Sequence, residues 1–432
     1  MKPLASRVKA IAPSPTVRLG NLAKDLQAQG KDVVNLGIGE PDFPTPAHIV
    51  AAGQKALADV AMTKYVSSLG LKELREAIAE KSKRENGIPG APDNVLVAPT
   101  KHCLFLASMA LVEPGDEVLM PDPGWVSYDP IARLCGGRPV PVRAADGEGF
   151  VMTPEALAEA ITPRSKVVLV NSPSNPAGSV YPEASMRGIA DLCKDHDLYL
   201  ISDEIYEKIL YEGRHVSPAA LDGMFERTVT VHGFSKTYAM TGWRIGWLVA
   251  DKPLVKEIVK VQEQTITCVP GFVQRAGVAA LTGPTAPIDK MVAEFKARRE
   301  VALQALEGIP GLDVYRPGGA FYVFPRVRAE RSSQALSERL LTEGHVAVTP
   351  GAAFGGAGEG HLRISYAASR EAIREGIRRI GEVLAKVEAG PPGARAPARR
   401  GKEKGKGVRA ATGPSGSRRS SGTSLRSAAC SS

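Results

Sequence analysis

Short apolar runs alternate with longer amphipathic segments through the middle of the chain. Apolar runs bounded by turn residues are typical of strands, and apolar positions three or four residues apart are typical of helices. Strands that alternate with helices build a mostly parallel sheet. The pattern therefore predicts an α/β domain, with strands at 94–98, 117–121, 166–171, 198–203, 228–234 and 245–250.

Helices are predicted between and before these strands. Segments 101–112 and 182–196 have the helical pattern, and Pro182 suits a first helical turn. Nearer the N-terminus, 16–29 is predicted as a helix that stops at Gly30, and 71–86 as an amphipathic helix that Gly87 closes.

The pattern changes after residue 250. A long helical stretch from about 252 to 307 precedes short predicted strands at 320–324, 345–349 and 362–366, which are interleaved with helices. We expect a second, smaller α+β lobe there, joined by the N-terminal segment. The predicted organisation is an N-terminal arm and small-domain segment (1–45), a large domain (46–285), a C-terminal small domain (286–388) and a disordered basic tail (389–432).

Charge is distributed unevenly along the chain. The 432 residues carry 55 Lys and Arg against 46 Asp and Glu, a net charge of +9. Residues 391–432 hold ten of the basic residues and a single acid, so the rest of the chain is neutral. A polyanion would therefore be attracted to the tail alone, with nonspecific, salt-sensitive affinity, and the tail has too few large apolar side chains to fold.

The remaining composition argues against several classes of protein. The cysteines lie far apart and the histidines lack ligand spacing, so we expect no disulfide framework and no metal site. The N-terminus lacks the apolar stretch of a signal peptide, and no run of about 18 apolar residues would span a membrane. These features predict a protein of the reducing cytoplasm.

Polar side chains follow several predicted strands where each strand ends. Asn171 and Asn175 follow one strand, Asp203 ends the next, and Ser235 and Lys236 follow a third. The carboxyl ends of parallel strands meet at one edge of the sheet, where ligands bind. We therefore expect these side chains to share a site.

An acid, an amide and a lysine are the groups that pyridoxal phosphate needs. A buried carboxylate favours the protonated ring nitrogen that makes the cofactor an electron sink, and Asp203 is the candidate. A lysine whose pKa is lowered by burial and nearby cations forms the Schiff base with the aldehyde, and Lys236 is the candidate. Arg244 is a plausible neighbour and phosphate ligand.

Three segments resemble the class I and II aminotransferases of pyridoxal-phosphate fold type I: NSPSNPAG (171–178), SDEIYEKILYEG (202–213) and FSKTYAMTGWRIGW (234–247). Further matches occur at 35–43, 63–79, 114–128, 318–324 and 363–367, so the resemblance covers roughly residues 5–387. The motifs are most similar to those of bacterial and archaeal aspartate aminotransferases. The resemblance implies a large cofactor-binding domain whose mostly parallel sheet is sandwiched by helices, plus a smaller α+β domain.

The resemblance also implies positions for the cofactor. Lys236 would form the Schiff base and Asp203 would pair with the ring nitrogen. The other implied contacts are Asn175 and Tyr206 with the 3-oxygen, Trp125 with the ring face, Ser235 and Arg244 with the phosphate, and Tyr65 with the phosphate from the partner subunit of a homodimer.

The turn before the helix at 101–112 departs from the family pattern. Many relatives have glycines or Ser-Gly there, whereas this chain has Ala98, Pro99, Thr100 and Lys101. Pro99 has no N–H to donate. We still expect the helix N-terminus, the Thr100 hydroxyl and Lys101 to contribute to phosphate binding.

Substrate contacts follow from the same resemblance. Arg363 would bind the α-carboxylate, for which its planar fork is suited, and Gly39 would let the backbone approach the substrate, beside Trp125 and Asn175. Ser14, Thr16 and Lys101 match positions that meet the side-chain carboxylate of an acidic substrate, although Ser14 and Thr16 could equally cap the first helix. The expected reaction is ping-pong transamination of aspartate or glutamate with 2-oxoglutarate, with aromatic or alanine-type substrates also open.

Three other functions remain as alternatives. A carbon-sulfur lyase would share Lys236, Asp203 and Arg363. A nucleic-acid-binding regulator on an aminotransferase-like body would need an added domain, and the enzyme-like segments begin almost at once. A nucleotide-dependent oxidoreductase is indicated only by Gly-Ile-Gly at 37–39, where the third glycine of the motif is missing.

Overall fold

The computed structural model describes residues 2–389 except 10, 12–14, 145, 146, 148 and 329–331. The predicted basic tail lies outside the described residues, apart from Ala389. The described chain forms one unit by its internal contacts. The predicted boundaries near residues 45 and 285 therefore stay a prediction.

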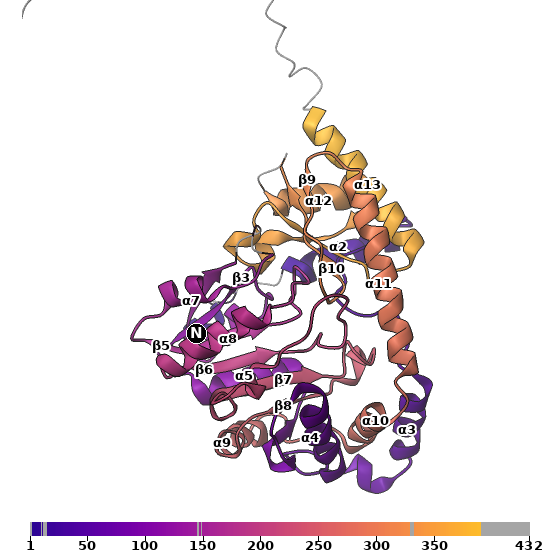
Figure 1. Ribbon diagram of the computed structural model, residues 1–432. Coiled ribbons are helices and arrows are strands. Elements are labelled where there is room, and N and C mark those ends of the chain that lie inside the picture. The colour runs from indigo at the N-terminus through magenta and orange to yellow at the C-terminus, as the bar shows by residue number, and fades with distance from the viewer. Residues whose placement is uncertain are drawn as a thin grey trace, which may run out of the picture. The chain divides into compact units, whose positions relative to one another are not determined.

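A seven-stranded sheet lies at the centre of the larger lobe of the described chain (Figure 1). β8 is antiparallel to both of its neighbours, and the other pairings in the sheet are parallel. This confirms the predicted α/β fold with a mostly parallel sheet. The strands, in sheet order, are β2 (Val95–Val97), β8 (Gly246–Val249), β7 (Thr228–Gly233), β6 (Tyr199–Asp203), β5 (Ser165–Asn171), β3 (Glu117–Asp122) and β4 (Arg138–Arg143).

Apolar side chains on both faces of the sheet explain why its central strands are continuous hydrophobic runs. On β5, Val167 and Leu169 pack into one cluster with α5, α6 and α9, while Val168 and Val170 pack into another with α7 and α8. A further cluster joins α4 and α10 to β2 and β8. These helices are α4 (Lys72–Asn86), α5 (Thr100–Leu111), α6 (Tyr128–Leu134), α7 (Pro154–Ala160), α8 (Glu183–Asp195), α9 (Lys252–Glu263) and α10 (Gly271–Thr282).

A second lobe packs around the long helix α11 (Ala286–Glu307), and it has its own apolar cluster (Figure 1). Its short strands form a parallel pair of β1 with β12, an antiparallel pair of β11 with β9, and a three-stranded antiparallel sheet β10-β14-β13. The strands are β1 (Val34–Asn35), β9 (Leu312–Asp313), β10 (Tyr322–Val323), β11 (Arg326–Val327), β12 (Val346–Ala347), β13 (Thr349–Pro350) and β14 (Leu362–Ser365). The other helices of the described chain are α1 (Ser6–Lys9), α2 (Pro15–Ala28), α3 (Ala47–Leu57), α12 (Ser333–Gly344) and α13 (Arg370–Ala389), with 3₁₀ turns at 60–63, 92–94, 218–220, 225–227, 241–243, 351–354 and 356–358.

The fold differs from the expected pattern in several places, and the predicted strand 345–349 is two strands, β12 and β13, which belong to different sheets. The helical stretch 252–307 divides into α9, α10 and α11, because Pro270 and the Gly283-Pro284 pair interrupt it. Strand β4 was not predicted, since two prolines break its apolar pattern. Proline is tolerated there because β4 is an edge strand.

Gly30 and Gly87 have positive φ, 78° and 72°, as expected for residues that close a helix. Among the described residues, no helix is both long and apolar enough to cross a membrane.

Candidate active site

The carboxyl ends of β5, β6 and β7 place several predicted side chains around one pocket of about 530 Å³. Asn171 and Asp203 are paired across β5 and β6, and the Asn171 side chain donates to the Asp203 carbonyl at 2.9 Å. The pocket also takes residues from the start of α5 and from the second lobe. The predicted site residues that line it are Gly39, Thr100, Lys101, Trp125, Asn175, Asp203, Tyr206, Ser235, Lys236, Arg244 and Arg363.

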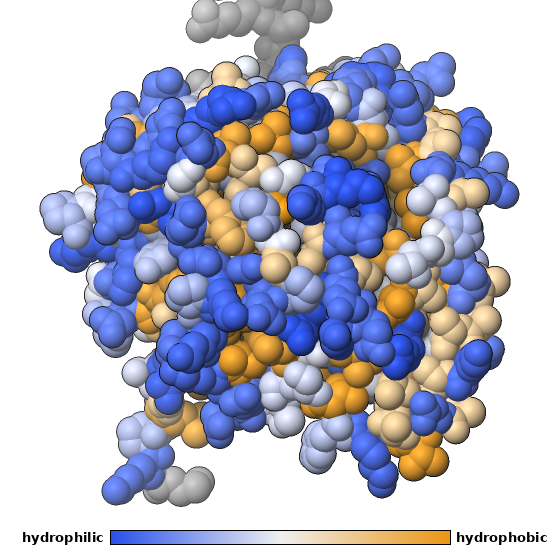
Figure 2. Space-filling model, turned by 60° about the horizontal axis from the view of Figure 1, so that its bottom comes forward, coloured by the Kyte–Doolittle hydropathy of each residue, from blue (hydrophilic) through white to orange (hydrophobic). Residues whose placement is uncertain are grey.

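The other predicted site residues do not join this pocket in the described chain. Tyr65 is 87% exposed and is not part of the lining, and its place in a partner's site stays a prediction. Leu57 and Val60, which are close to Tyr65 in sequence, are also exposed. Figure 2 shows hydrophobic residues among the hydrophilic ones on the side of the molecule nearest α3, α4 and α10. Ser14 and the side chain of Thr16 lie outside the described residues.

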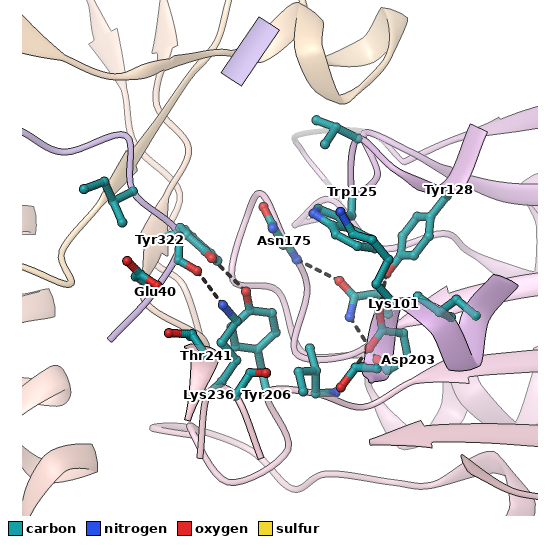
Figure 3. A pocket seen from close by; sticks show the side chains of 18 of the residues that line it. Glu40, Lys101, Trp125, Tyr128, Asn175, Asp203, Tyr206, Lys236, Thr241 and Tyr322 are labelled. Atoms are coloured by element: carbon teal, nitrogen blue, oxygen red, sulfur yellow. Dashed lines mark hydrogen bonds between the residues drawn. The ribbon is translucent and has the colours of Figure 1, made fainter. Parts of the chain in front are cut away.

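Lys236 projects into the pocket toward the segment that precedes α3 (Figure 3). Its Nζ donates to the Gly39 carbonyl at 2.5 Å. Burial lowers the pKa of Lys236 to about 8, and the nearby Arg363 and Arg244 guanidinium groups lower it in the same direction. The amine is therefore much easier to deprotonate than an ordinary lysine, as a nucleophile or a base requires.

Asp203 is buried at the opposite wall of the pocket. Tyr128 donates to its Oδ2 at 2.8 Å, and the Ile205 amide donates to Oδ1 at 3.3 Å. Burial raises the pKa of Asp203 to about 6, although the Tyr128 hydrogen bond opposes that shift. A cationic group placed against this carboxylate would be strongly favoured, because it would supply the counter-charge that the buried anion lacks.

Polar groups of the second lobe meet those of the sheet across the pocket. The hydroxyls of Tyr206 and Tyr322 are 2.7 Å apart. Arg363 donates to the Asn175 side chain at 3.1 Å and to the Gly37 carbonyl at 2.7 Å, and its guanidinium lies 4.6 Å from the Tyr322 ring centroid. The guanidinium is thus held in place at one side of the pocket with a fixed orientation.

Cations and a helix N-terminus form another part of the lining. Helix α5 begins at Thr100, so its first amides have no partner within the helix. Lys101 lies 4.9 Å above the Trp125 ring, and burial together with Arg244 lowers the pKa of Lys101. Ser235 lines the same pocket. Unpartnered amides at a helix start, beside a serine hydroxyl, are suited to an anion such as a phosphate.

Thr100 uses its hydroxyl differently from our expectation. The hydroxyl donates to the His232 carbonyl at 3.2 Å and packs against Gly233 and Gly246, where a β-carbon would come within 2.0 and 2.4 Å of it. Its proton is therefore already used within the fold. The backbone amide of Thr100 remains the group suited to a phosphate oxygen.

A close approach at Gly39 agrees with the reason given for glycine there. A β-carbon at this position would lie 2.8 Å from the Tyr322 hydroxyl. Any larger residue would therefore have to displace either the Tyr322 hydroxyl or the segment itself.

The sequence analysis missed several residues that line the pocket, and those with polar side chains are Glu40, Tyr128, Thr241 and Tyr322. Tyr128 and Tyr322 lie inside quoted motifs, at 114–128 and 318–324, so a closer look at the polar tips within those motifs could have found them. No signal in the sequence alone connects Tyr128 with Asp203, which lies 75 positions away.

Comparison with known proteins agrees with this geometry. Residues 31–380 match the family model described as aminotransferase class I and II. The chain is 43% identical to a probable aspartate/prephenate aminotransferase of Aquifex aeolicus, over 89% of this chain and all of that protein. It is 40% identical to aromatic-amino-acid aminotransferase 2 of Thermococcus litoralis, over 88% of this chain and 98% of that protein.

A solved structure shows the same fold. Aspartate aminotransferase from Thermus thermophilus, determined with maleate, superposes with a TM-score of 0.85 at 43% identity, covering 89% of this chain and all of the other. The family match, the fold and the pocket at the strand ends agree, and we conclude that the chain belongs to the class I and II aminotransferases and is an aminotransferase.

Proposed function

We propose that this enzyme uses pyridoxal 5'-phosphate to move the amino group of an acidic L-amino acid, aspartate or glutamate, to a 2-oxo acid such as 2-oxoglutarate by a ping-pong mechanism. The observation that carries the proposal is the meeting of Lys236, Asp203 and Arg363 around one pocket. An amine of lowered pKa, a buried carboxylate and a fixed guanidinium supply the three functions that the reaction needs. A homodimer in which Tyr65 completes the partner's site is part of the same proposal.

The donor set fits the cofactor. The first amides of α5, with Ser235 and Arg244, would hold the phosphate, and Asp203 would accept from the ring nitrogen. Asn175 and Tyr206 would donate to the 3-oxygen, and Trp125 would cover one ring face. When bound, the cofactor supplies the electron sink that stabilises a carbanion at the substrate α-carbon.

The residues of the chain do the proton transfer and the positioning. With a pKa lowered to about 8, Nζ of Lys236 is a competent base for the α-proton near neutral pH. Arg363 would bind the substrate α-carboxylate through a bidentate pair, and its hydrogen bonds to Asn175 and Gly37 fix its orientation beforehand. The base and the substrate carbon would then be held together without further ordering.

Lys101 is the described cation best suited to a substrate's side-chain carboxylate. It lies on the pocket wall above Trp125 and away from the hydrogen bonds that fix Arg363. The named activities of the Aquifex aeolicus and Thermus thermophilus relatives include aspartate. Ser14 and Thr16 are proposed as further contacts of that carboxylate.

Replacement of Lys101 by glutamine is expected to raise KM for aspartate by about ten- to hundredfold, since a charge-assisted pair contributes roughly 1.5–3 kcal/mol. KM for alanine or phenylalanine should change little, because neither carries a second carboxylate. The measurement is a substrate screen of wild type and Lys101→Gln with 2-oxoglutarate as acceptor, together with the cofactor affinity of each protein.

The screen also separates this function from its alternatives. Conversion of the bound cofactor to its amino form by aspartate supports the proposal. An equal loss for all amino acids, with weaker cofactor binding, would place Lys101 at the phosphate instead and contradict its substrate contact. Release of pyruvate and ammonia from cysteine conjugates, with no amino form of the cofactor, would identify a carbon-sulfur lyase.

A further inference from the structure

A cluster of buried charged side chains lies directly behind the residues that face the cofactor pocket. We call it the charge cluster: Lys81 on α4, Glu204 and Glu207 after β6, His215, and His232 on β7. The side chains of Lys81, Glu204, Glu207 and His232 are at most 8% exposed, and that of His215 is 11% exposed. Nothing in the transamination chemistry uses these groups directly.

Glu204 is fully buried and is surrounded by donors. Its Oε1 accepts from the hydroxyls of Ser202 at 2.9 Å and Ser217 at 2.8 Å, and its Oε2 lies 2.7 Å from Nε2 of His215. Nε2 of His232 is 3.4 Å from the same Oε2. The carboxylate is therefore fixed from the loop that holds His215 and Ser217 as well as from β6.

Glu207 is fixed from another direction. Its Oε1 accepts from the Lys81 ammonium, and its Oε2 accepts from the Asn86 side chain at 2.6 Å. Lys81 and Asn86 both belong to α4, so this part of the cluster connects the segment after β6 to that helix. At the rim, Glu85 contacts Lys81 at 3.8 Å and Lys208 at 2.7 Å.

The segment 203–207 thus has two sides. Asp203 and Tyr206 line the cofactor pocket, whereas Glu204 and Glu207 enter the charge cluster. The segment's backbone is also tied to its neighbours, since the Glu204 amide donates to the Val231 carbonyl at 2.9 Å. A shift of either carboxylate would move the two pocket side chains with it.

A metal ion is a weaker explanation for this cluster. Ligand atoms of Glu204, Glu207 and His215 do lie within 4.8 Å of one another. However, the Lys81 ammonium already contacts Glu207, and a buried ammonium beside the site would repel a second cation. His215 and Glu204 also satisfy each other directly.

We propose that the charge cluster positions Asp203 and Tyr206 against the cofactor, with Glu204 as its central positioning residue. The inference rests on the proposed use of pyridoxal phosphate. The cluster acts by pinning the far side of segment 203–207 to α4, to β7 and to the His215 loop.

The ionisation of the cluster supports this arrangement. Burial alone would raise the pKa of Glu204 and lower that of His215, but their mutual attraction reverses both shifts. Burial lowers the pKa of His232 to about 4, so this histidine is neutral at pH 7. When His215 is protonated, Lys81 and His215 balance Glu204 and Glu207, which is what a buried cluster requires.

The test compares wild type with Glu204→Gln and with Ser217→Ala, which removes one hydrogen bond to Glu204 and leaves every charge in place. Expected results for Glu204→Gln are faster hydrogen exchange in the peptide spanning 203–211 of the cofactor-free protein, a shifted pH midpoint of the bound cofactor's visible absorbance, and a loss of kcat on the order of tenfold. Ser217→Ala should change all three in the same direction by less. It also keeps the test informative if Glu204→Gln does not fold.

Glu117→Gln is the matched control. Glu117 is also fully buried, and it accepts from Thr162 and Ser165. It is the first residue of β3, so it lies at the amino-terminal end of that strand, whereas the pocket lies at the carboxyl ends of the strands. The Glu117→Gln variant should be less stable than wild type. Its pH midpoint of cofactor absorbance and its hydrogen exchange at 203–211 should both equal those of wild type. Equal changes in Glu117→Gln, or none in Glu204→Gln and Ser217→Ala, would overturn the positioning inference.

The pH dependence of unfolding gives a readout that needs no cofactor. Because the pKa of His215 is raised in the folded protein, its contribution to stability is full below the ordinary histidine value of about 6.5 and is lost as pH rises through the folded value. Wild type should therefore lose more stability than His215→Gln across that rise. If the unfolding free energies of the two proteins ran parallel with pH, His215 would carry no charge in the cluster, and the charge balance would be overturned. Failure of wild type to bind pyridoxal phosphate would refute the proposed function instead.

Discussion

Lys236→Ala is expected to lose transaminase activity by about 10⁴-fold or more, because in the proposed mechanism this one residue is both the covalent attachment of the cofactor and the base that moves the substrate's α-proton. The structure gives no substitute, since among the described pocket residues the other lysine, Lys101, lies over Trp125 near the start of α5. The rate should be measured as a single turnover with aspartate. Cofactor affinity is recorded in parallel.

A surface lysine provides the control for this variant. Lys252 is 70% exposed and pairs with Asp93 at 2.8 Å, and Lys252→Ala should leave the rate unchanged. Thermal unfolding of both variants shows whether each is folded. A folded Lys236→Ala protein with wild-type turnover would contradict the catalytic assignment.

Asp203→Asn is expected to reduce kcat by at least about 10²-fold, the usual cost of removing one preorganised electrostatic group. Asparagine keeps the shape of the side chain and can still contact Tyr128, but it carries no charge to hold a proton on the ring nitrogen. Cofactor affinity should fall as well, because the buried carboxylate of raised pKa is the proposed partner of that nitrogen. Steady-state kinetics with saturating cofactor separates the two effects.

Glu117→Gln again serves as the comparison, since it also removes a buried carboxylate from the sheet. Its kcat should equal that of wild type. If Asp203→Asn kept the kcat of Glu117→Gln at saturating cofactor, the carboxylate would have no electrostatic effect on the reaction, and the proposed pairing would be wrong.

The fold could be predicted from sequence largely because its central strands are buried on both faces. β5 and β6 are continuous apolar runs, and a run of that kind is visible without knowledge of its neighbours. Polar residues at the ends of those runs then indicated where the pocket lies, because the carboxyl ends of parallel strands meet at one edge. Lys236 and Asp203 were found in this way.

Features that depend on distant partners could not be predicted. In the sequence, Tyr128 looks like an ordinary residue at the start of a helix. Its hydrogen bond to Asp203 exists only because the folded chain places the end of β6 beside it. Glu204 resembles a solvated charge in the sequence, yet it is fully buried among side chains from other elements. The orientation of the Thr100 hydroxyl depends on the space that Gly233 and Gly246 leave for it.

The most direct test of the account is chemical reduction of the protein loaded with pyridoxal phosphate. After borohydride treatment and proteolysis, mass spectrometry should find one phosphopyridoxyl group per chain, on the peptide that contains Lys236. A label on another lysine, or a protein that takes up no cofactor and retains no label, would contradict the assignment of this pocket as the pyridoxal-phosphate site.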